Sequence, residues 1–383
     1  MLRRNSYIVL ALCMMISSCF ENKKKKEPSA AEYKISPGIN SDTFPRKNIT
    51  FILGKDENTR NPYYSLANQY YRLSDSEKTE IVIDTIYTLL DVRNYLEKHR
   101  PENNHPWGII NLVSHGNEFI DLSVLVSKTG SRVSEKSLQE AIDDSLFKPL
   151  DSRTIDKKTI FNLHGCAVGY NTGLLKMLSI AFGGSIQPAK IKASKMFEYY
   201  SYISQNKNPK MIRHYYARVW YAFYKADSIP SDNAIVESLK KNYPKDSVGW
   251  INALHQQYPE NPSEAYHIKL FIPVVWEDFY ESENQLPYLR TKTKQAKWLS
   301  NKTEFLSLMK KTRIPKEYFD IKFYTLIYHG DKGTIYSNKV KAKAGVLCII
   351  KPLLSKDDSI YIKYLPFIPS ENDSLYFSFA GSK

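Results

Sequence analysis

The stretches IINLVSHGNE, residues 109–118, and TIFNLHGCAVGYN, residues 159–171, decide how this chain folds. Each is a short apolar run that stops abruptly beside a glycine, the first at His115 and the second at Cys166. Such runs are typical of buried strands. If the two strands are parallel neighbours in an open α/β sheet, both ends emerge at the carboxyl edge, where these sheets bind ligands. We therefore expect His115 and Cys166 to form a Cys-His dyad.

Strands alternate with helices around these two stretches, which predicts βαβ units and a mostly parallel sheet in an α/β domain over residues 46–258. A later aromatic-rich stretch, residues 212–244, is read as two helices broken at Ile229-Pro230. Its aromatic side chains favour core packing over a stacking platform for bases or sugars. The predicted strands are 48–54, 79–86, 106–114, 159–166 and 185–194, and the predicted helices before residue 200 are 61–74, 89–99, 134–147 and 171–184.

Residues 263–383 have a different pattern, because strands follow one another with a single helix, residues 294–311, inserted. This order predicts an antiparallel, sandwich-like β domain without a catalytic cluster. We expect it to brace the first domain or to bind a partner or a glycan. The predicted strands are 266–276, 320–329, 333–337, 344–352, 359–369 and 375–381.

The N-terminus has the build of a secretory signal. Two arginines precede the apolar run 7–16, and Ser17-Ser18 stand before Cys19. Residues 16–19 also resemble a bacterial lipobox, in which the cysteine is acylated, although a plain signal with an incidental Cys19 is the alternative. We expect a signal peptide over 1–18, lipidation and membrane attachment at Cys19, and a flexible tether over 19–45.

The distribution of charge argues against a nucleic-acid partner, and the small number of cysteines argues against a disulfide framework. Residues 1–30 contribute +4 to the formal net charge of +14, and the remaining +10 is spread without a basic helix or an aromatic-basic repeat. We therefore expect no nucleic-acid partner. The run Lys23–Lys26 either attracts anionic lipid headgroups near the anchor or is a solvated part of the linker. Cys166 and Cys348 suggest no disulfide framework, and Cys348 lies inside a predicted strand.

In this arrangement the chain resembles the caspase-like fold of clan CD cysteine peptidases, a group that includes caspases, gingipains, clostripain-type enzymes and CHAT domains. The resemblance rests on the apolar block before His115-Gly116, the block before Gly165-Cys166, the helix TGLLKMLSIAFGG and the late helix pair. It covers residues 46–258. It implies a three-layer sandwich, Cys166 as nucleophile, His115 as general acid/base, and an oxyanion site made by the backbone N–H groups of Gly116 and Cys166. It implies no cofactor and no metal.

His164 is a further candidate. In members of the group that cleave after basic residues an Asp stands two positions before the cysteine, and His164 stands there in this chain. We expect His164 to line the substrate pocket and to tolerate a polar or acidic side chain, unless it only fills the strand end. His329-Gly330 belongs to a predicted hairpin, and the other histidines show no metal-ligand spacing.

These observations favour an exported, membrane-anchored cysteine endopeptidase that acts on a peptide or protein through an acyl-enzyme. Its expected location is the bacterial cell envelope, at the outer membrane, because Phe20 rather than Asp follows Cys19. One alternative is a catalytically inactive caspase-like lipoprotein that binds a peptide or an envelope component. A second is a sugar-binding surface lipoprotein that uses residues 263–383.

Overall fold

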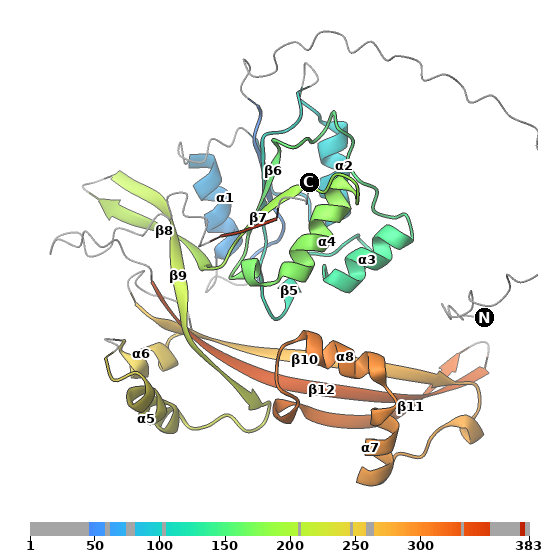
Figure 1. Cartoon of the computed structure of the whole chain (residues 1–383). Helices are drawn as coiled ribbons and strands as arrows, with labels where there is room; N and C mark the ends of the chain where they lie inside the picture. Colours follow the sequence, from blue (N-terminus) through green and yellow to red (C-terminus); the bar gives the residue numbers. More distant parts are fainter. Residues whose placement is uncertain are drawn as a thin grey trace, which may run out of the picture.

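The structure, a computed structural model, places two sheets side by side (Figure 1). It describes residues 46–57, 62–73, 81–101, 105–205, 208–245, 248–257, 264–330, 333–352 and 376–379. The predicted signal, the tether, the lipidation site at Cys19 and the predicted strand 359–369 lie outside these residues.

The first sheet contains five parallel strands, as the alternation of strands and helices predicted. The strand order is β13-β7-β6-β3-β1-β2, and β13 runs antiparallel at the β7 edge. Every parallel strand falls within a predicted strand. The central strands β1 and β3 are buried almost throughout and read as near-continuous apolar runs, whereas β7, next to the sheet edge, carries Lys190 and Lys192. The strands are β1 (Ile49–Ile52), β2 (Ile81–Ile83), β3 (Ile109–Val113), β6 (Ile160–His164), β7 (Lys190–Ser194) and β13 (Tyr376–Phe379).

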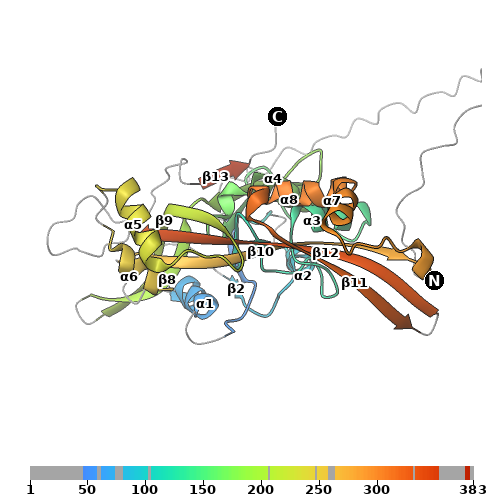
Figure 2. The ribbon, with the colours of Figure 1, turned by 90° about the horizontal axis from the view of Figure 1, so that it is seen from below.

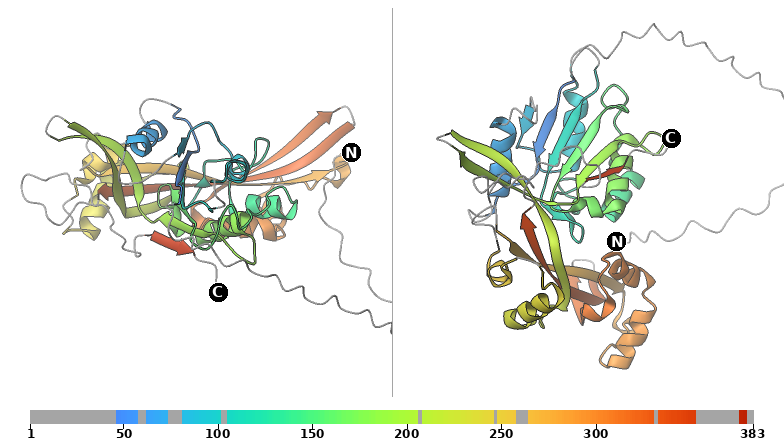
Figure 3. Two further views of the ribbon diagram at one scale, coloured as in Figure 1. Left: turned by 90° about the horizontal axis from the view of Figure 1, so that it is seen from above. Right: turned by 60° about the vertical axis from the view of Figure 1, so that its left-hand side comes forward.

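Helices cover both faces of this sheet (Figure 3, right). Side chains alternate along a strand, so Phe51 packs with the helices of one face while Ile52 packs against α1 on the other. On the first face Phe161 stacks on Phe182 of α4, with ring centroids 4.5 Å apart. The chain is therefore an α/β protein around a parallel sheet. The helices are α1 (Tyr63–Leu73), α2 (Leu89–Lys98), α3 (Glu135–Asp143) and α4 (Thr172–Gly183).

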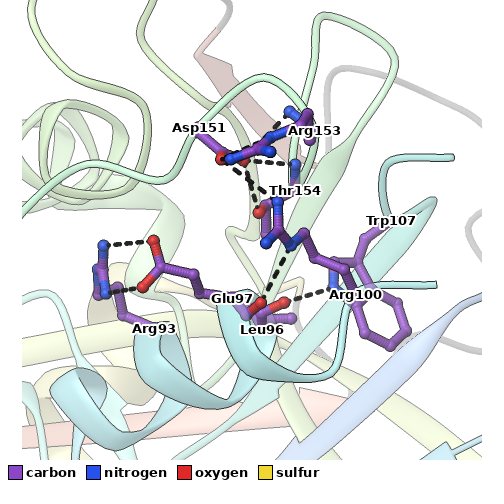
Figure 4. A network of polar contacts seen from close by, with 8 residues as sticks. All are labelled: Arg93, Leu96, Glu97, Arg100, Trp107, Asp151, Arg153 and Thr154. Atoms are coloured by element: carbon purple, nitrogen blue, oxygen red, sulfur yellow. Dashed lines mark hydrogen bonds and ion pairs between the residues drawn. The ribbon is translucent and has the colours of Figure 1, made fainter. Parts of the chain in front are cut away.

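A polar network holds α2 and the turn at Asp151 at the amino end of the parallel strands (Figure 4). The indole N–H of Trp107, which is buried just before β3, donates to Leu96 O over 3.1 Å. Arg100 bridges from the end of α2 to Asp151 at 3.4 Å, and Asp151 accepts the Thr154 hydroxyl at 2.8 Å. This network stabilises the edge of the sheet opposite His115 and Cys166.

The second sheet is antiparallel, as predicted for the C-terminal part, but it forms one layer of five strands. The central strand β12 pairs with β10 along one edge and with β9 and β11 in succession along the other. The strands are β8 (Phe197–Gln205), β9 (Asn208–Lys225), β10 (Tyr266–Tyr280), β11 (Asp320–Gly330) and β12 (Gly333–Pro352). β12 joins two runs that the sequence suggested as separate strands.

The prediction of a helix at the start of residues 212–244 is wrong, because this stretch is strand β9. Tyr and Trp are strong strand formers, and pairing with both β8 and β12 decides the outcome over local spacing. The second predicted helix is confirmed as α5 (Asp232–Asn242), which is followed by α6 (Trp250–His255). The late helix pair that contributed to the resemblance is therefore a strand and a helix.

The single helix predicted over 294–311 is two helices, α7 (Lys292–Ser300) and α8 (Thr303–Lys311). Two strand pairings cross the predicted boundary between residues 258 and 263. Lys225 of β9 pairs with Ala344 of β12, and β13 returns to the parallel sheet beside β7. The two predicted regions are thus joined by backbone hydrogen bonds.

Candidate active site

The ends of β3 and β6 bring the two predicted dyad residues to one place. Val113 of β3 and His164 of β6 are partners in register, and Ser114 N–H donates to His164 O over 3.0 Å. Both strands therefore end at the same edge of the sheet. Gly165 permits this approach, because a Cβ there would stand 2.9 Å from Ser114 O. The glycine beside the cysteine is therefore required by the contact between the two loops.

His115 and Cys166 line one pocket of about 740 Å³. The pocket lies between the carboxyl edge of the parallel sheet and the first residues of β10, since Tyr266–Leu270 form part of its wall. Gly116 and Glu198 also line it. The second sheet therefore contributes directly to the pocket that holds the predicted dyad.

His115 lies against two tyrosines of α1. Its ring stacks on Tyr63 with centroids 4.6 Å apart and meets Tyr64 edge-on at 4.7 Å. Its backbone N–H donates to the Tyr64 hydroxyl over 2.9 Å. Burial lowers the pKa of the His115 imidazole below its ordinary value, so the ring is neutral at pH 7 and able to accept a proton. No residue in the described part of the chain hydrogen-bonds its ring nitrogens.

Cys166 sits in a tight turn behind the strand end. Its half-buried thiol donates to Glu198 O over 3.8 Å, and burial raises the pKa of the thiol to about 12. Ala167 has φ 57° and donates its N–H to Met196 O over 2.9 Å, which fixes the turn. Helix α4 begins nearby, but the Asn171 side chain caps its first turn. The resting thiol is therefore protonated and needs a base.

The two backbone N–H groups of the predicted oxyanion site are not used by neighbouring strands or turns in the described part of the chain. Ser123 N–H donates to His115 O over 2.7 Å, and hydrogen-bonded and open pairs alternate in an antiparallel ladder. The next pair, Gly116 of β4 (Gly116–Asn117) with Leu122 of β5 (Asp121–Leu122), is therefore open, and the Gly116 N–H points away from β5. The Cys166 N–H has no acceptor among the described residues.

His164 is buried behind the pocket wall and is not among the lining residues. Its Nδ1 lies 3.1 Å from Glu198 Oε2 and 3.1 Å from Arg213 Nη1, and its Nε2 lies 3.2 Å from Asn111 Oδ1. The prediction that His164 lines the substrate pocket is therefore wrong, because its side chain belongs to a buried polar cluster. The expected tolerance of a polar or acidic substrate side chain stays a prediction.

The sequence reasoning missed a polar row on the α1 face of the parallel sheet. Asn111 donates to Thr50 Oγ1 over 3.0 Å, and Asn162 donates to Asn111 Oδ1 over 3.1 Å. These side chains are partners across β1, β3 and β6, and the row ends on His164. Asparagine inside two apolar runs was the available signal, because buried polar groups need partners. The row fixes the strand ends that carry the dyad.

The pH dependence of Cys166 alkylation follows from its environment. With the thiol pKa raised to about 12, the thiolate fraction grows throughout the neutral range. We expect the rate of modification by iodoacetamide to rise about tenfold per pH unit from about pH 6 to about pH 9. Site-resolved mass spectrometry measures this rate, with buried Cys348 as the unreactive reference. A rate that is already constant at about pH 6 would reveal a preformed thiolate-imidazolium pair and contradict this description.

Comparisons with known proteins do not identify a family for this chain. No protein-family model, no curated protein and no solved structure gives a significant match to this chain. Within the described ranges, no three His, Cys, Asp or Glu side chains gather as a metal site. No described helix has the length and apolar character needed to cross a bilayer.

Proposed function

We propose that this chain is a cysteine endopeptidase with a caspase-like fold. The observation that carries the proposal is the shared pocket of His115 and Cys166 at the carboxyl edge of a parallel sheet. The two residues stand at the ends of adjacent strands in the chain order of the clan CD peptidases. Helices on both faces of the sheet support the three-layer arrangement.

The proposed reaction begins when the Cys166 sulfur attacks the carbonyl carbon of a peptide bond. The neutral imidazole of His115 takes the thiol proton, and the carbonyl oxygen becomes an oxyanion that accepts hydrogen bonds from the Gly116 and Cys166 N–H groups. His115 then gives the proton to the leaving amine, so the C–N bond breaks and an acyl-enzyme remains. Water, deprotonated by His115, attacks the thioester and releases the carboxylic acid and the thiol.

The proposal also places the enzyme in the bacterial cell envelope, held by a lipid on Cys19 and acting on a peptide or protein. This part rests on the signal and lipobox pattern of residues 1–19 and on the polar sequence of the tether. It further implies that the pocket domain works at the end of a flexible linker.

The inactive, peptide-binding alternative has an observation in its favour. The Cys166 thiol is bonded to Glu198 O, and its pKa is raised to about 12 in the resting pocket. In a binding protein this closed thiol would remain unreactive. In the enzyme, a bound peptide would have to displace the thiol from Glu198 and bring the proton within reach of His115.

A peptide probe with a thiol-directed acyloxymethyl ketone distinguishes the two. We expect the wild-type protein to be labelled, and Cys166→Ala and His115→Ala to remain unlabelled, because the probe needs both nucleophile and base. In-gel fluorescence measures the labelling. Absence of label on the wild type across a set of peptide sequences would favour the binding protein.

A further inference from the structure

One face of the second sheet carries an unbroken lysine stripe. Lys339, Lys341 and Lys343 alternate along β12, so their side chains stand on the same face, and Lys322 is the β11 partner of Lys341. Lys341 and Lys343 are exposed. Lys343 Nζ lies 4.3 Å from the ring centroid of Phe271 on β10. The stripe therefore runs along the middle of the sheet.

Exposed apolar side chains flank the stripe on the same face. Phe279 of β10 is 64% exposed and Ile335 of β12 is 48% exposed, and the Phe279 ring lies 6.3 Å from that of Tyr328 on β11. We call this surface the lysine-aromatic face. It consists of Lys322, Lys339, Lys341, Lys343, Phe271, Val275, Phe279, Tyr324, Tyr328 and Ile335.

The rest of the described chain leaves this face open. Helices α7 and α8 pack on the opposite face, over Val340 and Ala342. Helices α5 and α6 cover the same face only farther along β12, at Leu347 and Ile349. The free ends of β10, β11 and β12 project beyond these helices (Figure 2). Apolar surface of this kind on a soluble protein marks an interaction site.

The charge of the face selects an anionic partner. Glu277 is held by Lys339 at 2.8 Å, and Lys322 holds Asp320 at 3.1 Å and the exposed Asp227 at 3.5 Å. Lys341 and Lys343 have no ion-pair partner among the described residues. The acids are thus compensated while two central lysines remain available.

We propose that the lysine-aromatic face binds the surface of an anionic lipid bilayer. Lysines attract the negatively charged headgroups, and aromatic and aliphatic side chains beside them enter the boundary between headgroups and acyl chains. An anionic polysaccharide would use the lysines but would leave Phe279 and Ile335 in water. The proposal concerns a surface other than the pocket and does not depend on peptidase activity.

Vesicle co-sedimentation tests the electrostatic part of the proposal. The protein is the full chain with Cys19→Ser, so that no lipid is attached, and the vesicles contain equal amounts of phosphatidylglycerol and phosphatidylcholine. We expect Lys341→Glu/Lys343→Glu to weaken binding at least about tenfold. The matched control, Lys292→Glu/Lys297→Glu, makes the same charge change at exposed positions of α7 and is expected to change binding less than about threefold.

The apolar contribution has its own test. Phe279→Ser is expected to weaken vesicle binding about threefold or more, whereas Ile251→Ser, at a 51% exposed position on α6, leaves it unchanged. Circular dichroism shows that each variant is folded. Equal losses for the two lysine pairs would overturn the proposal. A loss with the Lys341/Lys343 pair but none with Phe279→Ser would also overturn it and indicate an anionic polymer.

Discussion

Replacing His115 by alanine is expected to lower kcat for peptide hydrolysis about 100- to 10,000-fold, the usual contribution of a general acid-base group. The loss should be large because burial raises the Cys166 pKa to about 12, so the thiol does not ionise unaided near pH 7. Cys166→Ala should remove hydrolysis altogether, since no nucleophile remains. Steady-state kinetics on a peptide that the wild type cleaves measure both variants.

His329→Ala is the matched control for this prediction. His329 also precedes a glycine at the end of an apolar run, but it lies exposed at the end of β11 and contacts the Thr334 hydroxyl. We expect its replacement to leave kcat unchanged. A His115→Ala enzyme with wild-type kcat would show that another group takes the thiol proton, and the proposed mechanism would fail.

Replacing Glu198 by alanine is expected to reduce the free energy of unfolding by about 1–3 kcal/mol, the usual cost of leaving a buried polar group without its hydrogen-bond partner. The Glu198 side chain is fully buried, and its Oε2 lies 3.1 Å from Nδ1 of the buried His164 imidazole. Alanine would remove this acidic partner from the buried imidazole. Urea unfolding followed by tyrosine and tryptophan fluorescence measures the change.

Glu97→Ala is the matched control, because it removes a carboxylate from a more exposed ion pair, that with Arg93 on α2. Surface pairs of this kind contribute about 0–1 kcal/mol. If both variants lost the same stability, the buried contact between Glu198 and His164 would contribute no more than a surface ion pair. Because Glu198→Ala is expected to lose stability, the fraction of folded protein must be measured before its kinetic constants are compared with those of the wild type.

The centre of the parallel sheet was predictable because β1 and β3 are buried on both faces and read as apolar runs bounded by turns. Strand β9 was not. Its Tyr, Trp and Phe residues fit helical spacing and alternation equally well over a short window, and the choice depends on partners far away in sequence. Pairing of β9 with β12 joins residues more than a hundred positions apart, which no local pattern records.

The candidate site divides in the same way. His115 and Cys166 could be found because each follows an apolar run, and parallel strands bring such ends together. Glu198 could not, because it comes from β8 of the second sheet and no spacing relates it to Cys166. His164 was identified as important, but its side chain is directed into the buried polar row and Glu198 takes the place beside the thiol.

The lysine stripe on β12 was available in the sequence as alternating lysines, residues 339–343. These lysines do not form a basic helix, because a strand places every second residue on one face. The same alternation places Val340 and Ala342 in the core under α7 and α8. A single stretch thus builds both the core and the open face of the second sheet.

The most direct test of the central claim is to map the peptide acyloxymethyl ketone adduct on the full-length protein by site-resolved mass spectrometry. We expect a thioether on the Cys166 sulfur and on no other residue, formed in the wild type and absent from His115→Ala. An adduct on Cys348, an adduct on Cys166 that forms equally fast without His115, or no adduct on Cys166 would contradict it.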